Sequence, residues 1–369
     1  MSATGEVIDL TRQLVMRDST SGTDGEVLAL EWVAGWLRER GARVRIENEA
    51  GRPAALLATA ADASNASPLL LFAGHVDVVP VADHAAWVHP PFAAEVHDGR
   101  LFGRGASDMK SGLAASLLAA REAWRHGSPV AIGVTTGEEV GCLGAPALAR
   151  LLAPHRVGAV VIPESTGNDV VLGHRGATWL TVSSRGLAAH GSTPERGVNA
   201  VLRLAAALAR LGELPLRSHP RLGPESVNVG TIRGGSATNI VPDRASATID
   251  LRTVDDAREL VEWWRQLEGI DEVSTDLSLA AVWTGDEHPF VASLPAAVSG
   301  RPASYFTDAS VLIDALGPGV PIVVWGPGDP ATVHTVDESV PVEAAHEAAR
   351  LFTLTALGWG GCAGPDRAS

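Results

Sequence analysis

The spacing of apolar residues divides the first half of the chain into alternating helices and short strands. Apolar positions recur at helical spacing over residues 24–40 and 109–125, and Gly41 stands where the first helix would end. Short apolar runs, which are typical of strands, occupy 42–46, 54–58, 69–73, 130–136 and 158–163. Buried strands separated by helices predict an α/β domain whose central sheet is mainly parallel and flanked by helices.

The pattern changes in the middle of the chain. Alternation of apolar and polar positions predicts strands at 177–185, 226–233, 245–252 and 272–280, and helical spacing covers 197–211 and 255–267. This β-α-β-β-α-β order is the ferredoxin-like arrangement. The first pattern then resumes with helices at 308–316 and 342–358 and a buried strand at 322–325. We therefore expect one domain formed by residues 1–175 and 284–369, with residues 176–283 inserted as a second domain.

Composition and charge narrow the classes of function. The chain has 369 residues, of which 29 are basic and 43 acidic, so its formal net charge is −14. Binding of nucleic acid needs a basic surface, and this balance argues against such a partner. No apolar run reaches the roughly 18 residues of a membrane span. The N-terminal segment lacks the pattern of a signal peptide, and two cysteines, Cys142 and Cys362, cannot form a disulfide framework. We therefore expect a cytoplasmic protein.

Histidines and acidic residues follow several predicted strands at the point where each strand ends. They are His75 and Asp77 after 69–73, Glu138 and Glu139 after 130–136, Glu164 after 158–163, and His334 after 322–325. Asp108 lies just before the helix that we expect to begin near Met109. Because sites in open α/β sheets form at the carboxyl ends of parallel strands, all these side chains are expected on one rim of the sheet.

These residue types suit a metal centre. Two histidines with Asp108, Glu139 and Glu164 give the mixed nitrogen and oxygen ligands that zinc favours, although cobalt or manganese could replace it. An aspartate can bridge two ions about 3.5–4 Å apart. Asp77 could accept the second N–H of the His75 imidazole and fix its tautomer. Each feature is common by itself, but charged groups at the ends of apolar strands are costly unless they are paired or bind metal.

The adjacent glutamates Glu138 and Glu139 suggest two different roles. One of them can hold a metal ion while its neighbour acts as a general base. A glutamate pair on its own is more typical of a solvated surface. Its position directly after a predicted buried strand favours the catalytic interpretation.

Several segments resemble one family of metal-dependent enzymes. They are GHVDVVP (74–80), GRGASDMKSGLAA (103–115), TTGEEVGCLGA (135–145), IPES (162–165) and HTVDE (334–338). In order and spacing they are similar to the zinc-dependent family of acetylornithine deacetylases, succinyl-diaminopimelate desuccinylases and glutamate carboxypeptidases. The resemblance spans nearly the whole chain.

The resemblance implies two Zn²⁺ per chain and assigns their ligands. The first ion would be held by His75, Asp108 and Glu164. Asp108 would bridge to the second ion, which Glu139 and His334 complete. Glu138 would be the general base, and the peptide bond after Asp108 would be cis. One departure from the family is Gly137, where many relatives have an aspartate.

The resemblance extends into the inserted domain, through RGLAAHGSTPERGVNA (185–200) and GGSATNIVPDRASATIDLR (234–252). It implies that this domain is a lid and a dimerisation domain, and that the protein is a homodimer. His190 would reach into the site of the partner subunit and stabilise an oxyanion. Asn239 and Arg252 would bind the substrate carboxylate, for which a planar guanidinium is well suited.

The function implied is hydrolysis of an amide bond next to a carboxylate, above all removal of an acyl group, such as acetyl, from an N-acyl amino acid. The segment SYFTDAS (304–310) is nearer to the acetylornithine deacetylase pattern than to the desuccinylase pattern. A carboxypeptidase or dipeptidase that acts on small peptides is the alternative, because the chemistry is shared. A catalytically inactive metal-binding scaffold is a second alternative, and retention of Glu138 argues against it.

Two other side chains are candidate nucleophiles. Ser107 and Lys110 form an S-x-x-K motif like that of penicillin-recognising enzymes, but those enzymes also need a K-T-G motif, and Lys110 is the only lysine. Cys142 could act as a nucleophile, although a small buried thiol beside a metal loop explains it more simply.

Overall fold

The computed structural model describes residues 3–61, 67–317 and 319–361. Contacts divide the chain into two compact units, one of Met1–Gly173, Trp283–Ala303 and Thr307–Ser369, the other of His174–Val282 and Ser304–Phe306. Cys362 lies outside the described residues. None of the helices in the described part of the chain is long and apolar enough to cross a membrane.

The first unit is built on a six-stranded sheet with the order β1-β2-β6-β3-β7-β16. Its strands are β1 (Ala42–Glu49), β2 (Arg52–Ala60), β3 (Leu69–His75), β6 (Val130–Thr135), β7 (Val157–Ile162) and β16 (Ile322–Val324). Strands β6, β3, β7 and β16 are mutually parallel. The prediction of a mainly parallel central sheet is therefore confirmed.

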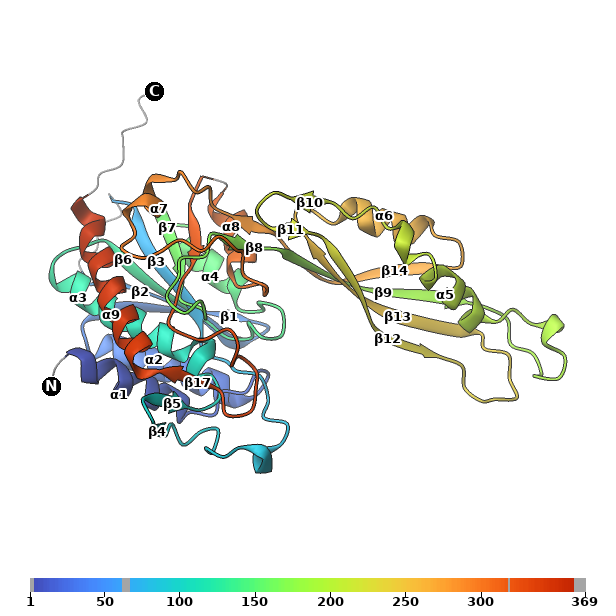
Figure 1. Ribbon diagram of the computed structural model, residues 1–369, viewed down its shortest axis with the longest axis horizontal. Helices are drawn as coiled ribbons and strands as arrows, with labels where there is room; N and C mark the ends of the chain where they lie inside the picture. Colours follow the sequence, from blue (N-terminus) through green and yellow to red (C-terminus); the bar gives the residue numbers. More distant parts are fainter. Residues whose placement is uncertain (1–2, 62–66, 318, 362–369) are drawn as a thin grey trace, which may run out of the picture. The chain divides into compact units, whose positions relative to one another are not determined.

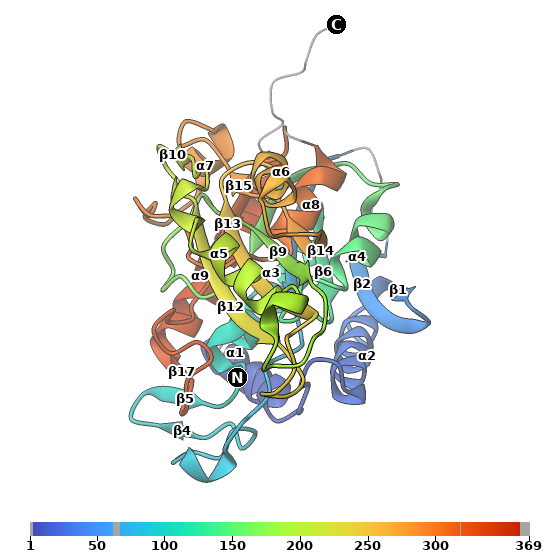
Figure 2. The same ribbon diagram turned by 90° about the vertical axis from the view of Figure 1, so that its right-hand side faces the viewer.

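The exception to the parallel arrangement is β2, which runs antiparallel to both β1 and β6. A turn at Ala50 and Gly51, both with positive φ, connects β1 to β2. Such a short connection allows only an antiparallel pair, because a parallel pair needs a crossover of a dozen residues or more. Figure 2 shows this hairpin in blue at the edge of the first unit.

Helices cover both faces of the sheet. The helices of this unit are α1 (Ala3–Val15), α2 (Asp24–Arg38), α3 (Ser111–Arg125), α4 (Ala145–Leu152), α7 (Pro289–Ser293), α8 (Ala309–Leu316) and α9 (Val342–Gly358). The apolar sides of α1, α2, α3 and α9 share one core with the sheet, and Figure 1 shows α9 beside α3. On the other face, Leu148 of α4 packs onto Gly133 of β6, and α8 contacts α4.

Capping explains where the second helix begins. The side chain of Thr23 accepts a hydrogen bond from the backbone N–H of Gly25, and Asp24 and Glu26 occupy the first turn, where negative charge is favourable. Beyond the other end of the helix, Gly41 adopts a φ of +83°, as the sequence predicts for a residue that ends a helix.

The second unit has a four-stranded antiparallel sheet with the order β12-β13-β9-β14. Its main elements are β9 (Gly176–Arg185), α5 (Ala200–Leu208), β12 (Ser226–Gly234), β13 (Arg244–Thr253), α6 (Arg258–Gln266) and β14 (Glu272–Leu279). Both helices pack into one apolar cluster with the sheet, and Figure 1 shows them on the same side of it. The order along the chain is β-α-β-β-α-β.

Several short strands lie outside the two main sheets. In the first unit, β4 (Val96–His97), β5 (Arg100–Phe102) and β17 (Ser339–Pro341) form a small sheet. The remaining two-residue strands are β8 (Gly173–His174), β10 (Ser218–His219), β11 (Gly223–Pro224) and β15 (Val282–Trp283).

A close approach between α3 and the end of β7 depends on one glycine. A Cβ atom at Gly112 would lie 1.8 Å from the carbonyl oxygen of Pro163, which precedes Glu164. The substitution Gly112→Ala should therefore lower the free energy of unfolding by about 1–3 kcal/mol, because the backbone must shift.

The matched control is Gly35→Ala, since Gly35 also lies inside a helix but has open space around it. This change should raise the free energy of unfolding by about 0.5–1 kcal/mol through helix propensity. Urea unfolding of both variants measures the difference. Equal stability of the Gly112→Ala variant and the wild type would contradict the role of this approach.

Candidate metal centre

Six titratable side chains come together at the carboxyl ends of the parallel strands. They are His75 at the end of β3, Glu138 and Glu139 after β6, Glu164 after β7, His334 in the loop after β16, and Asp108 in the turn η2 (Ala106–Lys110). The turn η2 differs from the predicted start of a helix near Met109. Asp108 has φ −115° and ψ 97°, and Met109 is also non-helical, so α3 begins only at Ser111. The peptide bond between Asp108 and Met109 is cis, as the resemblance implied.

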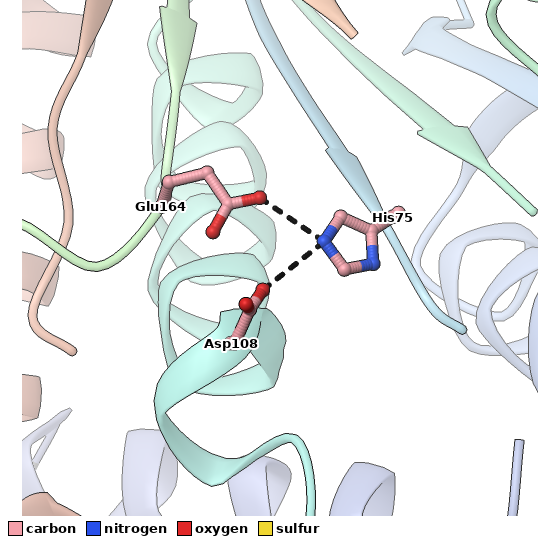
Figure 3. Close-up of side chains that lie close together, drawn as sticks. All are labelled: His75, Asp108 and Glu164. Atoms are coloured by element: carbon pink, nitrogen blue, oxygen red, sulfur yellow. Dashed lines mark hydrogen bonds and ion pairs between the residues drawn. The ribbon is translucent and has the colours of Figure 1, made fainter. Parts of the chain in front are cut away.

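The first group of potential ligands is His75, Asp108 and Glu164 (Figure 3). His75 Nε2 lies 3.0 Å from Glu164 Oε1 and 3.3 Å from Asp108 Oδ1. Figure 3 shows the two carboxylates approaching the same edge of the imidazole, from the end of β7 and from the turn before α3. His75 and Glu164 come from adjacent strands of the sheet, and both are almost fully buried.

The second group is Asp108, Glu139 and His334. His334 Nε2 lies 3.0 Å from Glu139 Oε2 and 3.3 Å from Asp108 Oδ2. Asp108 therefore presents one oxygen to His75 and the other to His334. The His334 side chain is 47% exposed and its φ is +62°, so this histidine is the least enclosed member of the cluster.

Glu138 lies beside the two groups without belonging to either. Its Oε2 is 3.9 Å from His75 Nε2, and its Oε1 is 3.9 Å from the sulfur of Cys142. For the protein chain alone, burial raises the pKa of Glu138 well above its usual range, and the nearby carboxylates of Glu164, Asp308 and Glu139 add to this rise. A buried carboxylate next to the ligand groups has the location that a general base needs.

Asp77 fixes two segments of the site to each other. Its carboxylate accepts hydrogen bonds from the backbone N–H groups of Glu138 and Glu139, each at 3.2 Å, and from the hydroxyl of Ser21 at 2.8 Å. His75 Nδ1 lies 3.0 Å from the backbone carbonyl oxygen of Asp77 and 3.6 Å from its carboxylate. The carbonyl is thus the closer acceptor for the imidazole N–H, because the carboxylate is engaged with the glutamate loop.

The cluster concentrates negative charge in a poorly solvated place. Burial and the carboxylate of Asp108 raise the pKa of Glu164 to about 8. Hydrogen bonds to Asp108 and Glu139 raise the pKa of His334 to about 10. Glu164 thus resists ionisation unless positive charge is near it, and the imidazole of His334 holds its proton because carboxylates lie beside it.

The donor set fits divalent metal ions. Each group offers one imidazole nitrogen together with carboxylate oxygens, which is a combination that zinc accepts. Ligand atoms around a tetrahedral zinc ion lie about 3.4 Å apart, since each is about 2.1 Å from the metal. The observed separations of 3.0–3.3 Å from the imidazole nitrogens agree with such an arrangement.

The remaining predicted residues belong to the second unit and fall at two ends of its sheet. The exposed His190 and Asn239 are neighbours, because the backbone N–H of Gly191 donates to the carbonyl oxygen of Asn239 and His190 pairs with Ile240. His190 follows the end of β9, and Asn239 precedes the start of β13, which pairs with that end of β9. Arg252 instead pairs with Ala177, near the beginning of β9. The eight residue-to-residue steps from Ala177 to Arg185 correspond to about 26 Å of strand.

The side chain of Arg252 is held by two neighbouring residues of the second unit, Asp250 and Phe306. Its guanidinium donates to Asp250 Oδ2 at 3.1 Å and lies 5.5 Å from the ring centre of Phe306. These contacts orient the side chain and leave a planar cation half-buried. The same contacts would also be expected of a structural arginine.

The two alternative nucleophiles lack the required partners among the described contacts. The ammonium group of Lys110 donates to the carbonyl oxygen of Arg17 at 3.0 Å, whereas the hydroxyl of Ser107 contacts Ser165 and the carbonyl oxygen of Asp329. Burial raises the pKa of the Cys142 thiol, which disfavours the reactive thiolate.

Sequence reasoning gave no role to two buried carboxylates at the site. Asp308 accepts a hydrogen bond from the hydroxyl of Thr135, and Glu338 accepts hydrogen bonds from the backbone N–H groups of Ser107 and Asp108. Asp308 precedes an apolar helix, where an aspartate usually caps, but its side chain makes no cap hydrogen bond. Glu338 lies inside the segment HTVDE, but nothing in a single sequence reveals its burial.

Comparison with known proteins agrees with this site. Residues 71–358 match the model of peptidase family M20/M25/M40. A succinyl-diaminopimelate desuccinylase of Phenylobacterium zucineum (strain HLK1) is 32% identical in an alignment of length 377 that covers 93% of this chain and 95% of that protein. A second, from Caulobacter vibrioides (strain NA1000 / CB15N), is 33% identical over 316 residues, which cover 78% of this chain and 80% of that protein.

Solved structures share the fold. The M20 family metallo-carboxypeptidase Sso-CP2 from Sulfolobus solfataricus superposes with a TM-score of 0.81 at 19% identity, covering 97% of this chain and 100% of that one. The YXEP protein of Bacillus subtilis, described as a dinuclear metal binding peptidase of the M20 family, gives a TM-score of 0.72 at 14% identity, covering 97% and 98%. The family match and the relatives above 30% identity are decisive: the chain belongs to peptidase family M20/M25/M40 and is a metal-dependent hydrolase.

Proposed function

We propose that this protein uses two zinc ions to hydrolyse an amide bond adjacent to a carboxylate, and that its substrates are N-acyl amino acids. The observation that carries the proposal is the shared carboxylate of Asp108, with one oxygen 3.3 Å from the imidazole of His75 and the other 3.3 Å from that of His334. An aspartate placed in this way suits a pair of metal ions. The relatives described as succinyl-diaminopimelate desuccinylases support an N-acyl amino acid and make an N-succinyl group the first to test.

Each of the two groups of side chains would bind one metal ion. His75, Asp108 and Glu164 would hold one ion, and Asp108, Glu139 and His334 the other. When bound, the ions would polarise the amide carbonyl and lower the pKa of the attacking water toward neutrality.

Glu138 supplies the proton transfers. Its carboxylate takes a proton from the water as the new carbon–oxygen bond forms, and returns this proton to the amine nitrogen as the carbon–nitrogen bond breaks. Asp77 keeps Glu138 in place, because it binds the backbone N–H groups of both glutamates.

The second unit acts as a lid and completes the site from two subunits. Arg252 would bind the substrate carboxylate with a charge-assisted pair of hydrogen bonds. Asn239 lies with His190 at the opposite end of β9, so Asn239 and Arg252 of one chain cannot hold the same small carboxylate. We therefore assign His190 and Asn239 together to the site of the partner subunit in a homodimer, with His190 stabilising the oxyanion.

Exposed apolar side chains support association through this unit. They gather on α5, on the edge strand β12 and on the adjoining loops, and are Leu187, Val198, Leu202, Ile232 and Ile240. Leu202 is 66% exposed and Ile232 is 62% exposed. Such a group of side chains next to an unpaired strand edge is typical of an interface, and a second copy of the chain is the partner that fits the division of the site.

Replacing Glu138 tests the assignment of the base. The Glu138→Ala enzyme should retain two zinc ions per chain, while its kcat falls by about 10²–10⁴-fold because proton transfer is lost. Metal analysis and steady-state kinetics measure the two quantities. Glu31→Ala is the control, because Glu31 is exposed on α2. A kcat near that of the wild type would show that another group is the base.

Mixing two inactive variants tests the shared site. Glu138→Ala subunits co-expressed with His190→Ala subunits should recover about a quarter of the wild-type activity, because half of the dimers are mixed and each holds one intact site. A mixture of Glu138→Ala with Glu139→Ala should recover none, since both residues serve the same subunit's site. Failure of the first mixture to recover activity, although mixed dimers form, would place His190 in its own subunit's site.

A substrate panel tests the reaction itself. Purified protein would be incubated with N-succinyl, N-acetyl and N-formyl amino acids and with dipeptides, and released amine measured with zinc and after chelation. Release from an acyl amino acid that stops on chelation and returns with zinc is the expected result. Preference for dipeptides would identify a peptidase instead, and two bound metals without any release would favour an inactive scaffold.

A further inference from the structure

Glu338 is a fully buried carboxylate that belongs to neither group of ligands and has no part in the proposed proton transfers. Its two oxygens have separate partners. Oε1 accepts hydrogen bonds from the backbone N–H groups of Ser107 and Asp108, each at 3.0 Å. Oε2 accepts a hydrogen bond from Arg104 Nη1 at 2.6 Å. Glu338 therefore binds the backbone of the residue whose side chain is shared by both ligand groups.

Arg104 extends this connection to the histidine loop. It is almost fully buried, and its Nη1 also donates to the carbonyl oxygen of Thr335 at 3.3 Å, next to His334. The backbone N–H of Gly103 donates to the carbonyl oxygen of Glu338 at 2.8 Å. The segments 103–108 and 334–338 are far apart in the sequence. The ion pair between Arg104 and Glu338 joins them, and further hydrogen bonds to backbone atoms of both segments reinforce this connection.

The members of the two ligand groups differ in how firmly the sheet holds them. His75 ends a central strand, and Glu164 follows the strand paired with it. His334 and Asp108 have no such support, because one lies in a loop with a positive φ and the other in a non-helical turn. The separation of 3.3 Å between His334 Nε2 and Asp108 Oδ2 therefore depends on how the two segments are joined.

We propose that the pair formed by Glu338 and Arg104 is a positioning brace that sets the distance between Asp108 and His334, and thereby retains the metal ion held by Asp108, Glu139 and His334. The brace rests on the proposed two-metal function. Loss of the brace should release this second ion before the ion held by His75, Asp108 and Glu164, because the sheet continues to place two ligands of the first ion. Partners that orient ligands typically change metal affinity by about 10–100-fold.

Zinc titration of the metal-free protein tests the proposal. Wild-type protein, stripped with a chelator, should bind two Zn²⁺ per chain against a chromophoric competitor. In Glu338→Gln the weaker zinc affinity should fall by about 10–100-fold, while the tighter one changes much less. Glu139→Ala provides the reference for loss of the second ion, and activity of Glu338→Gln should return as free zinc is raised.

A buried glutamate paired with a partly exposed arginine in the second unit gives the control. Glu225 is buried, accepts from Arg217 Nη2 at 2.9 Å, and also accepts from the backbone N–H groups of Arg217 and Val254. Glu225→Gln removes the same kind of charge from the same kind of environment. It should lower the midpoint of urea unfolding and leave both zinc affinities unchanged, which separates a loss of stability from a loss of positioning.

The outcomes distinguish the brace from the metal centre. If Glu338→Gln does not fold, Arg104→Lys keeps the positive charge but not the forked geometry, and it should weaken the second ion in the same sense. A folded brace variant with both zinc affinities at wild-type values, or with both reduced equally, would refute the brace alone. Absence of zinc binding by the wild type would refute the metal centre and the brace together.

Discussion

A single carboxylate organises the site. Asp108 faces one imidazole with each of its oxygens, so its position relates two groups of side chains that come from different parts of the sheet. The backbone at Asp108 departs from the helix, and α3 begins three residues later, at Ser111. It also gathers several buried carboxylates around two histidines, and such a cluster is tolerable when cations compensate its charge.

The loops that carry these side chains are held by carboxylates that bind backbone N–H groups. Asp77 does this for Glu138 and Glu139, and Glu338 does it for Ser107 and Asp108. In each case an acidic side chain near one ligand secures the main chain of another. A charged acceptor makes stronger hydrogen bonds than a neutral one, and burial removes competition from water. The positions of the potential ligands therefore depend on Asp77 and Glu338 as well as on the ligand residues themselves.

The sequence predicted the sheet, the rim and the residues gathered there, because apolar runs followed by polar side chains are local signals. It did not reveal that β2 is antiparallel, since apolar periodicity carries no strand direction, although the turn at Ala50 and Gly51 is too short for a crossover. The buried partners Asp308 and Glu338 were given no role, because acids beside apolar segments are usually solvated or cap helices. The separation of Asn239 from Arg252 required the register between β9 and β13.

The residues of the two ligand groups are synthesised at different times during translation. His75, Asp108 and Glu164 all lie within the first 164 residues, whereas His334 comes after the whole second unit and the strand β16. A nascent chain therefore contains every side chain of the first group long before the second group can exist. Domains generally fold as units, and the first unit also needs residues 283–303 and 307–369, so the complete first unit can form only after the whole second unit has been synthesised.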